Sequence, residues 1–238
     1  MSNSTSIKIS DSLNGYAAQP AGKGPFPGML VLMEAFGITA HIQGVCERLA
    51  SAGFMAMAPD IFHGDVFAYT DMDKVWPKIQ TIRDDQVMGE MAESLDWLRT
   101  QDNVSKDRLG ILGFCMGGRL AFLAHCRFPD RLQAAVSFYG GGIAPDGPDR
   151  FGRIPPIDEA EKMRAPVFLG YGAEDNNITP TEHARVAQTL SAAKKRYTLA
   201  VYPGAGHGFL CEERASYVPA MADIAWKDIM DFLQNILG

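Results

Sequence analysis

The sequence predicts a single α/β domain over residues 1–238, with a mostly parallel sheet flanked by helices. Short apolar runs rich in β-branched residues alternate with longer amphipathic stretches, which is typical of parallel strands joined by crossover helices. The composition, with 47% hydrophobic and 21% charged residues, provides enough apolar material for one core. Neither an internal repeat nor an interdomain linker interrupts the alternation, so we expect one domain.

The first part of the chain predicts a hairpin, a buried strand, a helix and a further strand. Residues 6–19 contain a Leu-Asn-Gly turn, which favours a hairpin. Residues 29–33 are continuously apolar, as expected for a central strand. The helix that follows has Thr39 in position to cap its start and Gly53 in position to end it, and the next strand is predicted at 54–58. One face of this helix carries four apolar residues, Ile42, Val45, Cys46 and Leu49.

The rest of the chain continues the alternation to the C-terminus. A long helix is predicted by the spacing of Met88, Met91, Leu95 and Leu98. Further strands are predicted at 108–114, 134–138, 166–171 and 197–201. Further helices are predicted at 117–128, around 181–193, and at the C-terminus, on the apolar face of Ala225, Ile229, Phe232, Leu233 and Ile236. The Gly/Pro-rich segment 140–156 lies between strands of the same sheet, so we interpret it as a long loop beside a site, in the place where a lid would lie.

Charge and hydrophobicity exclude several classes of partner. The 22 basic and 28 acidic residues give a net charge of −6, which repels phosphate backbones, so we expect no nucleic-acid partner. A small anionic substrate remains compatible, because one local arginine can override a weak global field. No apolar run approaches the length of a membrane span, and the first ten residues lack the pattern of a signal peptide, so we expect no membrane partner.

The cysteines indicate a reducing compartment. The four of them, Cys46, Cys115, Cys126 and Cys211, include no CxxC pair. We therefore expect a cytoplasmic protein with reduced thiols, either a monomer or a homodimer. No histidine or cysteine lies at metal-ligand spacing from these residues, so the sequence predicts no metal and no cofactor.

Residues 113–118, Gly-Phe-Cys-Met-Gly-Gly, lie between a predicted strand and a predicted helix. This arrangement matches a nucleophile elbow, in which a tight turn holds the nucleophile in a strained conformation and leaves no room for side chains two positions away. Gly113 and Gly117 supply that room, and the start of the helix favours a thiolate at Cys115. The alternative is a buried structural cysteine beside glycines that permit close packing.

A nucleophile of this type needs an acid and a base. In proteins whose nucleophile lies in such an elbow, the acid and then the base follow it along the chain. Asp175 follows the predicted strand 166–171, and a carboxylate at the carboxyl end of a strand points into the crevice where α/β proteins bind ligands. His207 follows the last predicted strand, among small residues on a loop. Because Glu174 adjoins Asp175, the acid could instead be Glu174.

Four other histidines compete with His207 for the role of base. Two of them, His125 and His183, lie within helical patterns, where packing or surface roles are more common. The other two, His41 and His63, could line the crevice, since one opens a helix and the other follows a Pro-Asp turn. Neither is a better base by its position.

Glu34 directly follows the buried strand at 29–33, where a carboxylate is costly without a partner. The loop that follows such a strand also provides the second N–H group of the oxyanion hole in this class of fold. The alternative is a carboxylate that caps a helix or is solvated.

Together these segments resemble the dienelactone hydrolase family. The resemblance runs through MLVLMEAFG, APD, GFCMGGRLAF, FYGG, GAED and GHGF, and covers nearly the whole chain. It implies an α/β-hydrolase fold with an eight-stranded, mostly parallel sheet and no large cap domain. It also implies roles for the catalytic residues: Cys115 as nucleophile, His207 as base, Asp175 as its orienting acid, Glu34 as a carboxylate that contacts the resting thiol, and the backbone N–H groups of Met116 and Ala35 as the oxyanion hole.

The chain departs from this family at one position. Members that act on dienelactone bind its carboxylate with an arginine four residues after the catalytic histidine, and Cys211 occupies that position here. Arg214 and Arg83 are the nearest replacements in the sequence, but no pattern places either side chain in the site. Because the arginine that would bind a carboxylate is missing, we expect neutral esters to be better substrates than carboxylated lactones. The residues predicted to line the substrate pocket are Phe36, Phe62, Trp76, Tyr139, Phe209, Cys211 and Arg214.

The sequence therefore predicts a hydrolase that cleaves small carboxylic esters or lactones through a thioester acyl-enzyme. Two alternatives stay open. One is a broad carboxylesterase or thioesterase that tolerates phosphotriesters, and the other is a ligand-binding homologue that has lost turnover.

Overall fold

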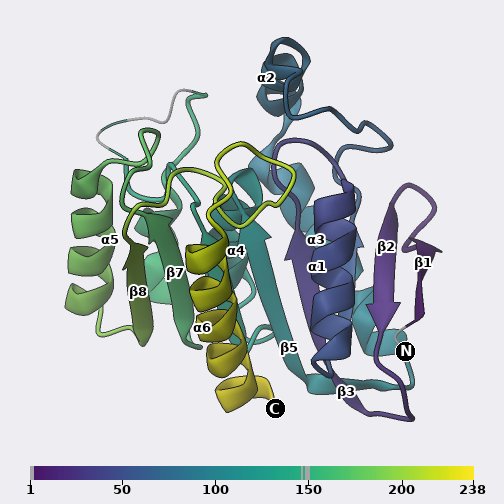
Figure 1. The fold of residues 1–238 in the computed structure, drawn as a ribbon. Helices are drawn as coiled ribbons and strands as arrows, with labels where there is room; N and C mark the ends of the chain where they lie inside the picture. The colour runs from purple at the N-terminus through teal and green to yellow at the C-terminus, as the bar shows by residue number, and fades with distance from the viewer. Residues whose placement is uncertain (1–2, 146, 148–150) are drawn as a thin grey trace.

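The computed structural model describes residues 3–145, 147 and 151–238, and over these residues the chain forms a layered α/β structure (Figure 1). Its strands are β1 (Asn3–Lys8), β2 (Asn14–Gln19), β3 (Phe26–Leu32), β4 (Met55–Pro59), β5 (Val104–Phe114), β6 (Ala134–Phe138), β7 (Val167–Gly172) and β8 (Tyr197–Tyr202). Its helices are α1 (Ala40–Ser51), α2 (Met72–Thr81), α3 (Asp84–Thr100), α4 (Met116–Arg127), η1 (Pro156–Lys162), α5 (Pro180–Ala192) and α6 (Pro219–Leu237).

The described strands form one sheet of eight, in the order β1-β2-β4-β3-β5-β6-β7-β8. Pairing with β2 is antiparallel on both of its sides, and every other pair is parallel. In Figure 1, α1 and α6 lie in front of the sheet, and α3 and α4 lie behind it. The predicted sheet with flanking helices is thereby confirmed. Because the carboxyl ends of β3, β5 and β7 lie at one edge, the loops after them meet there.

The central strands are buried on both faces, which is why their sequences are continuously apolar. Every residue of β6 is buried, as is every residue of β7. The sheet therefore forms a rigid base, and the loops at its edge are the parts free to carry function. No helix of the described residues is both long and apolar enough to cross a bilayer.

The structure differs from the prediction mainly in the segments that connect the predicted elements. Neither α2 nor η1 was expected; α2 carries Pro77 in its interior, and this residue weakens a helical pattern. Thr39 does sit at the N-cap of α1, yet its side chain makes no capping hydrogen bond, and its hydroxyl contacts Tyr69 instead. The predicted loop ends where η1 begins, at Pro156. Whether the loop 140–156 acts as a lid stays open, and its residues 146 and 148–150 lie outside the described residues.

Candidate active site

Cys115 sits at a turn of one residue between β5 and α4, with a positive φ of 54°. The flanking glycines are required sterically: a Cβ at Gly113 would lie 2.0 Å from the carbonyl oxygen of Gly117, and a Cβ at Gly117 would lie 2.4 Å from that of Leu32. The turn is anchored by the Cys115 N–H, which donates to the carbonyl oxygen of Phe138 at 3.0 Å. This geometry holds the sulfur above the end of the sheet, at the start of a helix.

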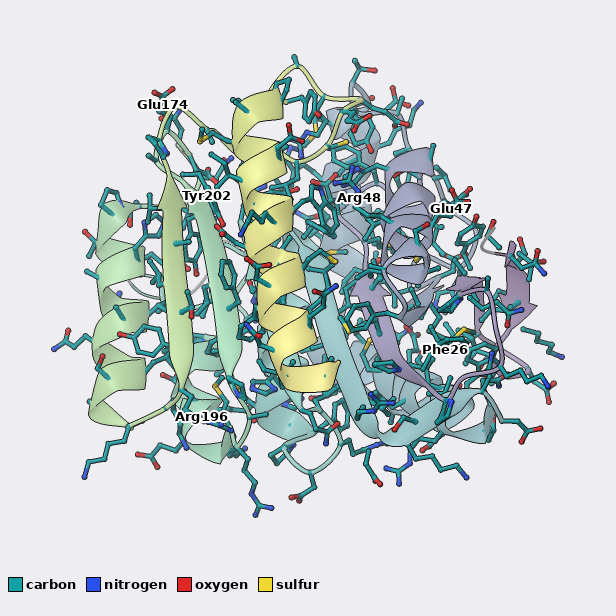
Figure 2. The ribbon with its side chains drawn as sticks, turned by 60° about the horizontal axis from the view of Figure 1, so that its bottom comes forward. Phe26, Glu47, Arg48, Glu174, Arg196 and Tyr202 are labelled. Atoms are coloured by element: carbon teal, nitrogen blue, oxygen red, sulfur yellow. The ribbon has the colours of Figure 1, made fainter. Side chains whose placement is uncertain are left out.

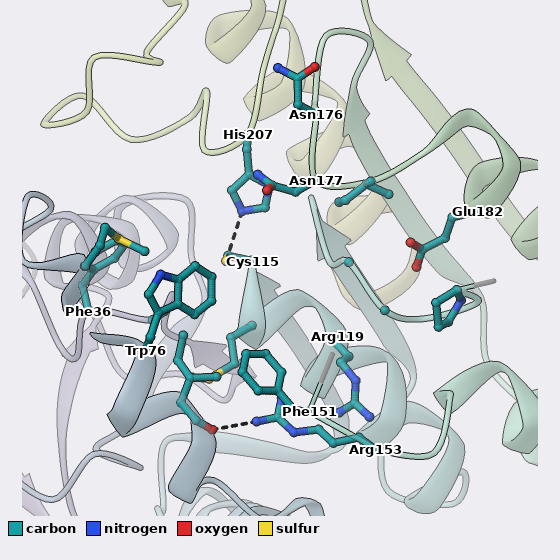
Figure 3. A pocket seen from close by; sticks show the side chains of 18 of the residues that line it. Phe36, Trp76, Cys115, Arg119, Phe151, Arg153, Asn176, Asn177, Glu182 and His207 are labelled. Carbon is teal, nitrogen blue, oxygen red and sulfur yellow. Dashed lines mark hydrogen bonds between the residues drawn. The ribbon is translucent and has the colours of Figure 1, made fainter. Parts of the chain in front are cut away.

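Two hydrogen bonds link Cys115, His207 and Asp175 in a row, and Figure 3 shows the one between Cys115 and His207. Nε2 of His207 lies 3.1 Å from Sγ of Cys115, and Nδ1 of His207 lies 2.7 Å from Oδ2 of Asp175. The other carboxylate oxygen of Asp175 accepts the backbone N–H of Asn177 at 2.8 Å. The carboxylate thus orients the imidazole, and its own position is fixed by a local turn.

Glu174, the alternative acid, is exposed, and Figure 2 shows it at the periphery of the molecule. Asp175, by contrast, is buried and bonded to the imidazole. Because only one of these neighbouring carboxylates reaches His207, the ambiguity that the sequence left between them is removed by the direction of the backbone after β7.

The protonation of His207 is set by opposing effects. Burial lowers its pKa, but a negative charge on Cys115 and the hydrogen bond to Asp175 outweigh burial and raise the pKa to about 10. With Cys115 as a thiolate, the imidazole is a cation at neutral pH, with one N–H directed at the sulfur and the other at the carboxylate. An imidazolium beside a sulfur atom favours the thiolate, which is the nucleophilic form.

Glu34 is almost fully buried at the end of β3, and its partner is Arg214. Oε1 accepts a hydrogen bond from Nη1 of Arg214 at 3.0 Å, and no hydrogen bond joins Glu34 to Cys115 in the described part of the chain. The resemblance implied that Glu34 contacts the resting thiol, and the structure shows Glu34 bonded to the guanidinium of Arg214 instead. Burial raises the pKa of Glu34, and the charge of Arg214 opposes this by favouring the carboxylate.

Arg214 also connects this ion pair to the cavity. Its guanidinium carbon lies 5.6 Å from the ring centre of Phe36 and 5.9 Å from that of Tyr69. The side chain lines the cavity, whereas Arg83, the other candidate from the sequence, directly precedes α3 and donates to the carbonyl oxygen of Gln80 on the surface. Of the two arginines, the structure therefore places Arg214 at the site.

The cavity has a volume of about 570 Å³ and lies directly above Cys115. Met116, the first residue of α4, and Ala35, which follows β3, both line it. The first-turn N–H groups of α4 have no partner within the helix, which suits them to bind an anion. Figure 3 shows Phe36 and Trp76 on one side and Glu182 on the other.

Three of the predicted pocket residues, Phe36, Trp76 and Arg214, line this cavity. The other four do not, and the prediction for them is corrected: Phe62, Tyr139, Phe209 and Cys211 have no exposed surface and pack in the layer beneath. The ring of Tyr139, for example, lies 5.2 Å from that of His207 and supports it from below. Sequence position gives the strand end from which a side chain comes, but not its depth.

Several lining residues were not anticipated from the sequence. They come from α2, the segment after β6, the turn after β7, and α5: Met72, Ile79, Gly141, Gly142, Phe151, Arg153, Asn176, Asn177, Ile178 and Glu182, with Arg119 from α4. The position of Asn177 could have been predicted, because an Asp side chain commonly accepts a hydrogen bond from the backbone N–H two residues later and so forms a turn. For the residues of α2 and of the segment after β6, no pattern in the sequence indicates that they fold over Cys115.

None of the four competing histidines is hydrogen-bonded to the sulfur in the described part of the chain. Nε2 of His125 contacts the carbonyl oxygen of Ala165, and His183 stacks on Tyr171. The ring of His41 packs edge-on against Phe114. His63 pairs with Glu90 on α3. Among the described histidines, His207 is thus the one bonded to Cys115.

A mostly parallel sheet with a nucleophile elbow after β5, and with a carboxylate and a histidine on later loops at the same edge, defines the α/β-hydrolase class. The family model of the dienelactone hydrolase family matches residues 13–237. The chain belongs to this family and is therefore a hydrolase.

Relatives and solved structures resemble it over nearly its whole length. A Methylorubrum extorquens protein named "Putative carboxymethylenebutenolidase" is 35% identical over 225 residues, which are 92% of this chain and 76% of that protein. A Bradyrhizobium protein named "Probable 2-oxo-3-(5-oxofuran-2-ylidene)propanoate lactonase" is 31% identical over 225 residues, 94% of this chain and 90% of that protein. The crystal structure of a Klebsiella pneumoniae protein described as "Putative Dienelactone Hydrolase" superposes with a TM-score of 0.90 at 30% identity, over 98% of this chain and 99% of that one.

Proposed function

We propose that this chain hydrolyses lactones or esters of carboxylic acids, with Cys115 as nucleophile, His207 as general acid and base, and Asp175 as the residue that orients the imidazole. The observation that supports this most strongly is the pair of hydrogen bonds, 2.7 and 3.1 Å long, that runs from a buried carboxylate through an imidazole to a sulfur at the floor of the cavity. This is the arrangement that nucleophilic catalysis requires.

The first step forms a thioester. The sulfur of Cys115 attacks the carbonyl carbon, and the carbonyl oxygen becomes an oxyanion next to the backbone N–H groups of Met116 and Ala35. Each such donor is typically worth about 3 kcal/mol in the transition state. When the intermediate collapses, the C–O bond breaks and the alkoxide takes the proton that His207 holds toward the sulfur.

The second step regenerates the enzyme. Neutral His207 removes a proton from a water molecule, whose oxygen attacks the thioester carbon, and the C–S bond then breaks to return the sulfur as a thiolate beside the imidazolium. For a lactone the alkoxide stays tethered to the acyl group, so hydrolysis of the thioester must be faster than ring closure. Asp175 accepts the second imidazole N–H throughout.

Glu34 is assigned a positioning role in this proposal. Its carboxylate holds Arg214 at the cavity wall, so it acts on the substrate through the arginine. The same pairing keeps a buried negative charge close to the site, compensated by the guanidinium.

Arg214 lines the cavity, and a guanidinium group is a suitable donor to an anionic group on a substrate. The other two guanidinium groups in the lining have partners of their own, since Arg119 pairs with Asp84 and Arg153 donates to the carbonyl oxygen of Ile79. The names of the two relatives described above both denote a lactone with a carboxylate substituent. We therefore revise the expectation that neutral esters are preferred, since it depended on the absence of an arginine that Arg214 provides from a different position.

Substitution of Cys115 tests the proposal. Cys115→Ala should lower kcat for ester and lactone hydrolysis by about 10⁴-fold or more, because no other group supplies the nucleophile. Cys126→Ala is the matched control, since Cys126 is a buried thiol remote from the cavity, and should retain turnover.

Turnover assays of the unaltered protein and of Cys115→Ala also distinguish the proposed function from the two alternatives, a broad esterase and a ligand-binding homologue. Substantial turnover by Cys115→Ala would refute the proposal, and absence of turnover by the unaltered protein on every ester and lactone would favour a ligand-binding role. Faster turnover of phosphotriesters or thioesters than of oxygen esters would favour the broader esterase.

A further inference from the structure

Three side chains that can bind a metal meet next to the proposed catalytic residues, although they come from separate parts of the chain. Glu34 follows β3, His41 lies in the first turn of α1, and Cys211 lies on the loop after β8. One potential ligand atom from each residue, a carboxylate oxygen, a ring nitrogen and the sulfur, lies within 4.8 Å of the other two. Their sequence separation explains why ligand spacing along the chain predicted no metal.

Two of these side chains have buried polar atoms without a partner. Oε1 of Glu34 is bonded to Arg214, but Oε2 has no hydrogen-bond partner among the described residues. Nε2 of His41 is likewise buried and unpaired in the part of the chain described. A buried acceptor without a partner costs about 1–3 kcal/mol, so its persistence in a core calls for an explanation.

The third ligand is supported by its neighbours. The thiol of Cys211 donates to the hydroxyl of Tyr69 at 3.2 Å, and that hydroxyl lies 3.1 Å from the hydroxyl of Thr39. If Cys211 loses its proton to a metal, the Tyr69 hydroxyl can reverse its role and donate to the thiolate. Arg214 orients the Glu34 carboxylate in the same way, and such outer contacts are a regular feature of metal sites.

We propose that Glu34, His41 and Cys211 form a binding site for a divalent cation of the zinc type. A set of one oxygen, one nitrogen and one sulfur ligand excludes magnesium and calcium, which prefer oxygen alone, and suits zinc, which accepts all three.

Metal binding requires the three ligand atoms to move slightly closer together. Bond lengths of about 2.0–2.3 Å place the ligand atoms of a tetrahedral zinc about 3.3–3.8 Å apart, somewhat closer than the 4.8 Å limit observed here. Binding forms a metal–sulfur bond and releases the thiol proton to solvent. Three protein ligands leave a fourth position for water or another small ligand.

Cobalt absorption tests the proposal without any measurement of turnover. Cys115→Ser removes the nearby active-site thiol, so a thiolate-to-cobalt charge-transfer band in this variant must come from another cysteine. We expect one equivalent of Co²⁺ to produce the band and Zn²⁺ to displace it. The band should be absent from Cys115→Ser/Cys211→Ser and present in Cys115→Ser/Cys126→Ser, where a buried cysteine outside the cluster is changed instead.

The histidine ligand provides a second test that does not depend on the folding of the Cys211 variant. His41→Phe keeps the ring and its packing against Phe114 but removes the lone pair, and should weaken Zn²⁺ binding at least tenfold in competition with a chromophoric chelator. His183→Phe is the matched control, since Nε2 of His183 is also buried and has no hydrogen-bond partner among the described residues, but lies outside the cluster.

Either of two results would overturn the inference: no cobalt band in Cys115→Ser, or Zn²⁺ affinity that is equal in His41→Phe and His183→Phe. Loss of ester hydrolysis in the cysteine variants has no bearing on these readouts, so the metal site and the proposed function can fail independently.

Discussion

Cys115 combines a backbone that few side chains tolerate with an electrostatic setting that suits a thiolate. The positive φ directs the sulfur out of the turn, and the imidazolium of His207 meets it at 3.1 Å. These residues could be predicted from the sequence, because each follows a recognisable strand and lies in a distinctive pattern with glycine. The partner of Glu34 could not, since Arg214 is separated from it by 180 residues and lies in no motif.

The protonation of His207 gives a prediction at this scale. Because a negative charge on Cys115 is the largest effect that raises the pKa of His207, Cys115→Ala should lower that pKa from about 10 toward or below its ordinary value of 6.5. In the unaltered protein the imidazole stays protonated through neutral pH and loses its proton near pH 10, whereas in the variant it is largely neutral above pH 7.

NMR titration of the histidine ring signals measures this difference. The pKa of His125, which burial lowers to about 4, should be the same in both proteins and serves as an internal control. Equal titration of His207 in both proteins would show that the sulfur carries no charge in the resting state.

Arg214 gives a second prediction, about substrate choice. Arg214→Met should lower kcat/KM about tenfold or more for a lactone with a carboxylate, because a hydrogen-bonded charge contributes about 1.5–3 kcal/mol. A neutral methyl ester of the same lactone should change much less. The ratio of the two kcat/KM values is the useful measure, since the active fraction of enzyme cancels in it.

Arg83→Met is the control for this experiment, because Arg83 lies outside the cavity and should leave the ratio unchanged. A fall of equal size for both substrates in Arg214→Met would contradict anion recognition and point to a structural role for the ion pair with Glu34.

At the scale of elements, the junction of β5 and α4 determines where the nucleophile lies. Gly117→Ala should destabilise the fold by more than about 3 kcal/mol, since the added methyl group would meet the backbone carbonyl oxygens of Leu32 and Met33 at 2.4–2.5 Å, and neither strand nor helix can move independently. Gly89→Ala is the matched control: its methyl group meets nothing within 4 Å, and alanine favours the helix by about 1 kcal/mol.

Urea unfolding of the two variants measures this difference. The contrast should have opposite signs, with Gly117→Ala shifted to lower urea and Gly89→Ala to higher. A Gly117→Ala protein of normal stability would mean that the junction can relax, and the steric account of the elbow would then be wrong.

The elements that were missed are those held by tertiary contacts. In α2, an internal proline and few buried residues leave a weak pattern, although Trp76 from this helix lines the cavity. The strands were predicted because burial on both faces makes their sequences continuously apolar. Their bounds shifted where a strand extends beyond its continuously buried part, as β5 does through the exposed Lys106 and Asp107.

For the whole molecule, the fold class followed from the alternation of strands and helices, and the edge at which the functional loops meet followed from the parallel sheet. The shape of the cavity did not, because it depends on segments that cross the site without a repeating pattern. The extent of the domain over residues 1–238, the cytoplasmic location and the monomeric or homodimeric state stay predictions.

The central claim is that the sulfur of Cys115 carries the acyl group between the two steps. Rapid acid quenching of the enzyme during turnover of an activated aryl ester, followed by mass spectrometry of its peptides, tests this directly. We expect the added mass of one acyl group on the peptide that contains Cys115, and none on the peptides that contain Cys46, Cys126 or Cys211. Turnover at an undiminished rate with no acyl group on Cys115, or with the acyl group on another residue, would contradict the account.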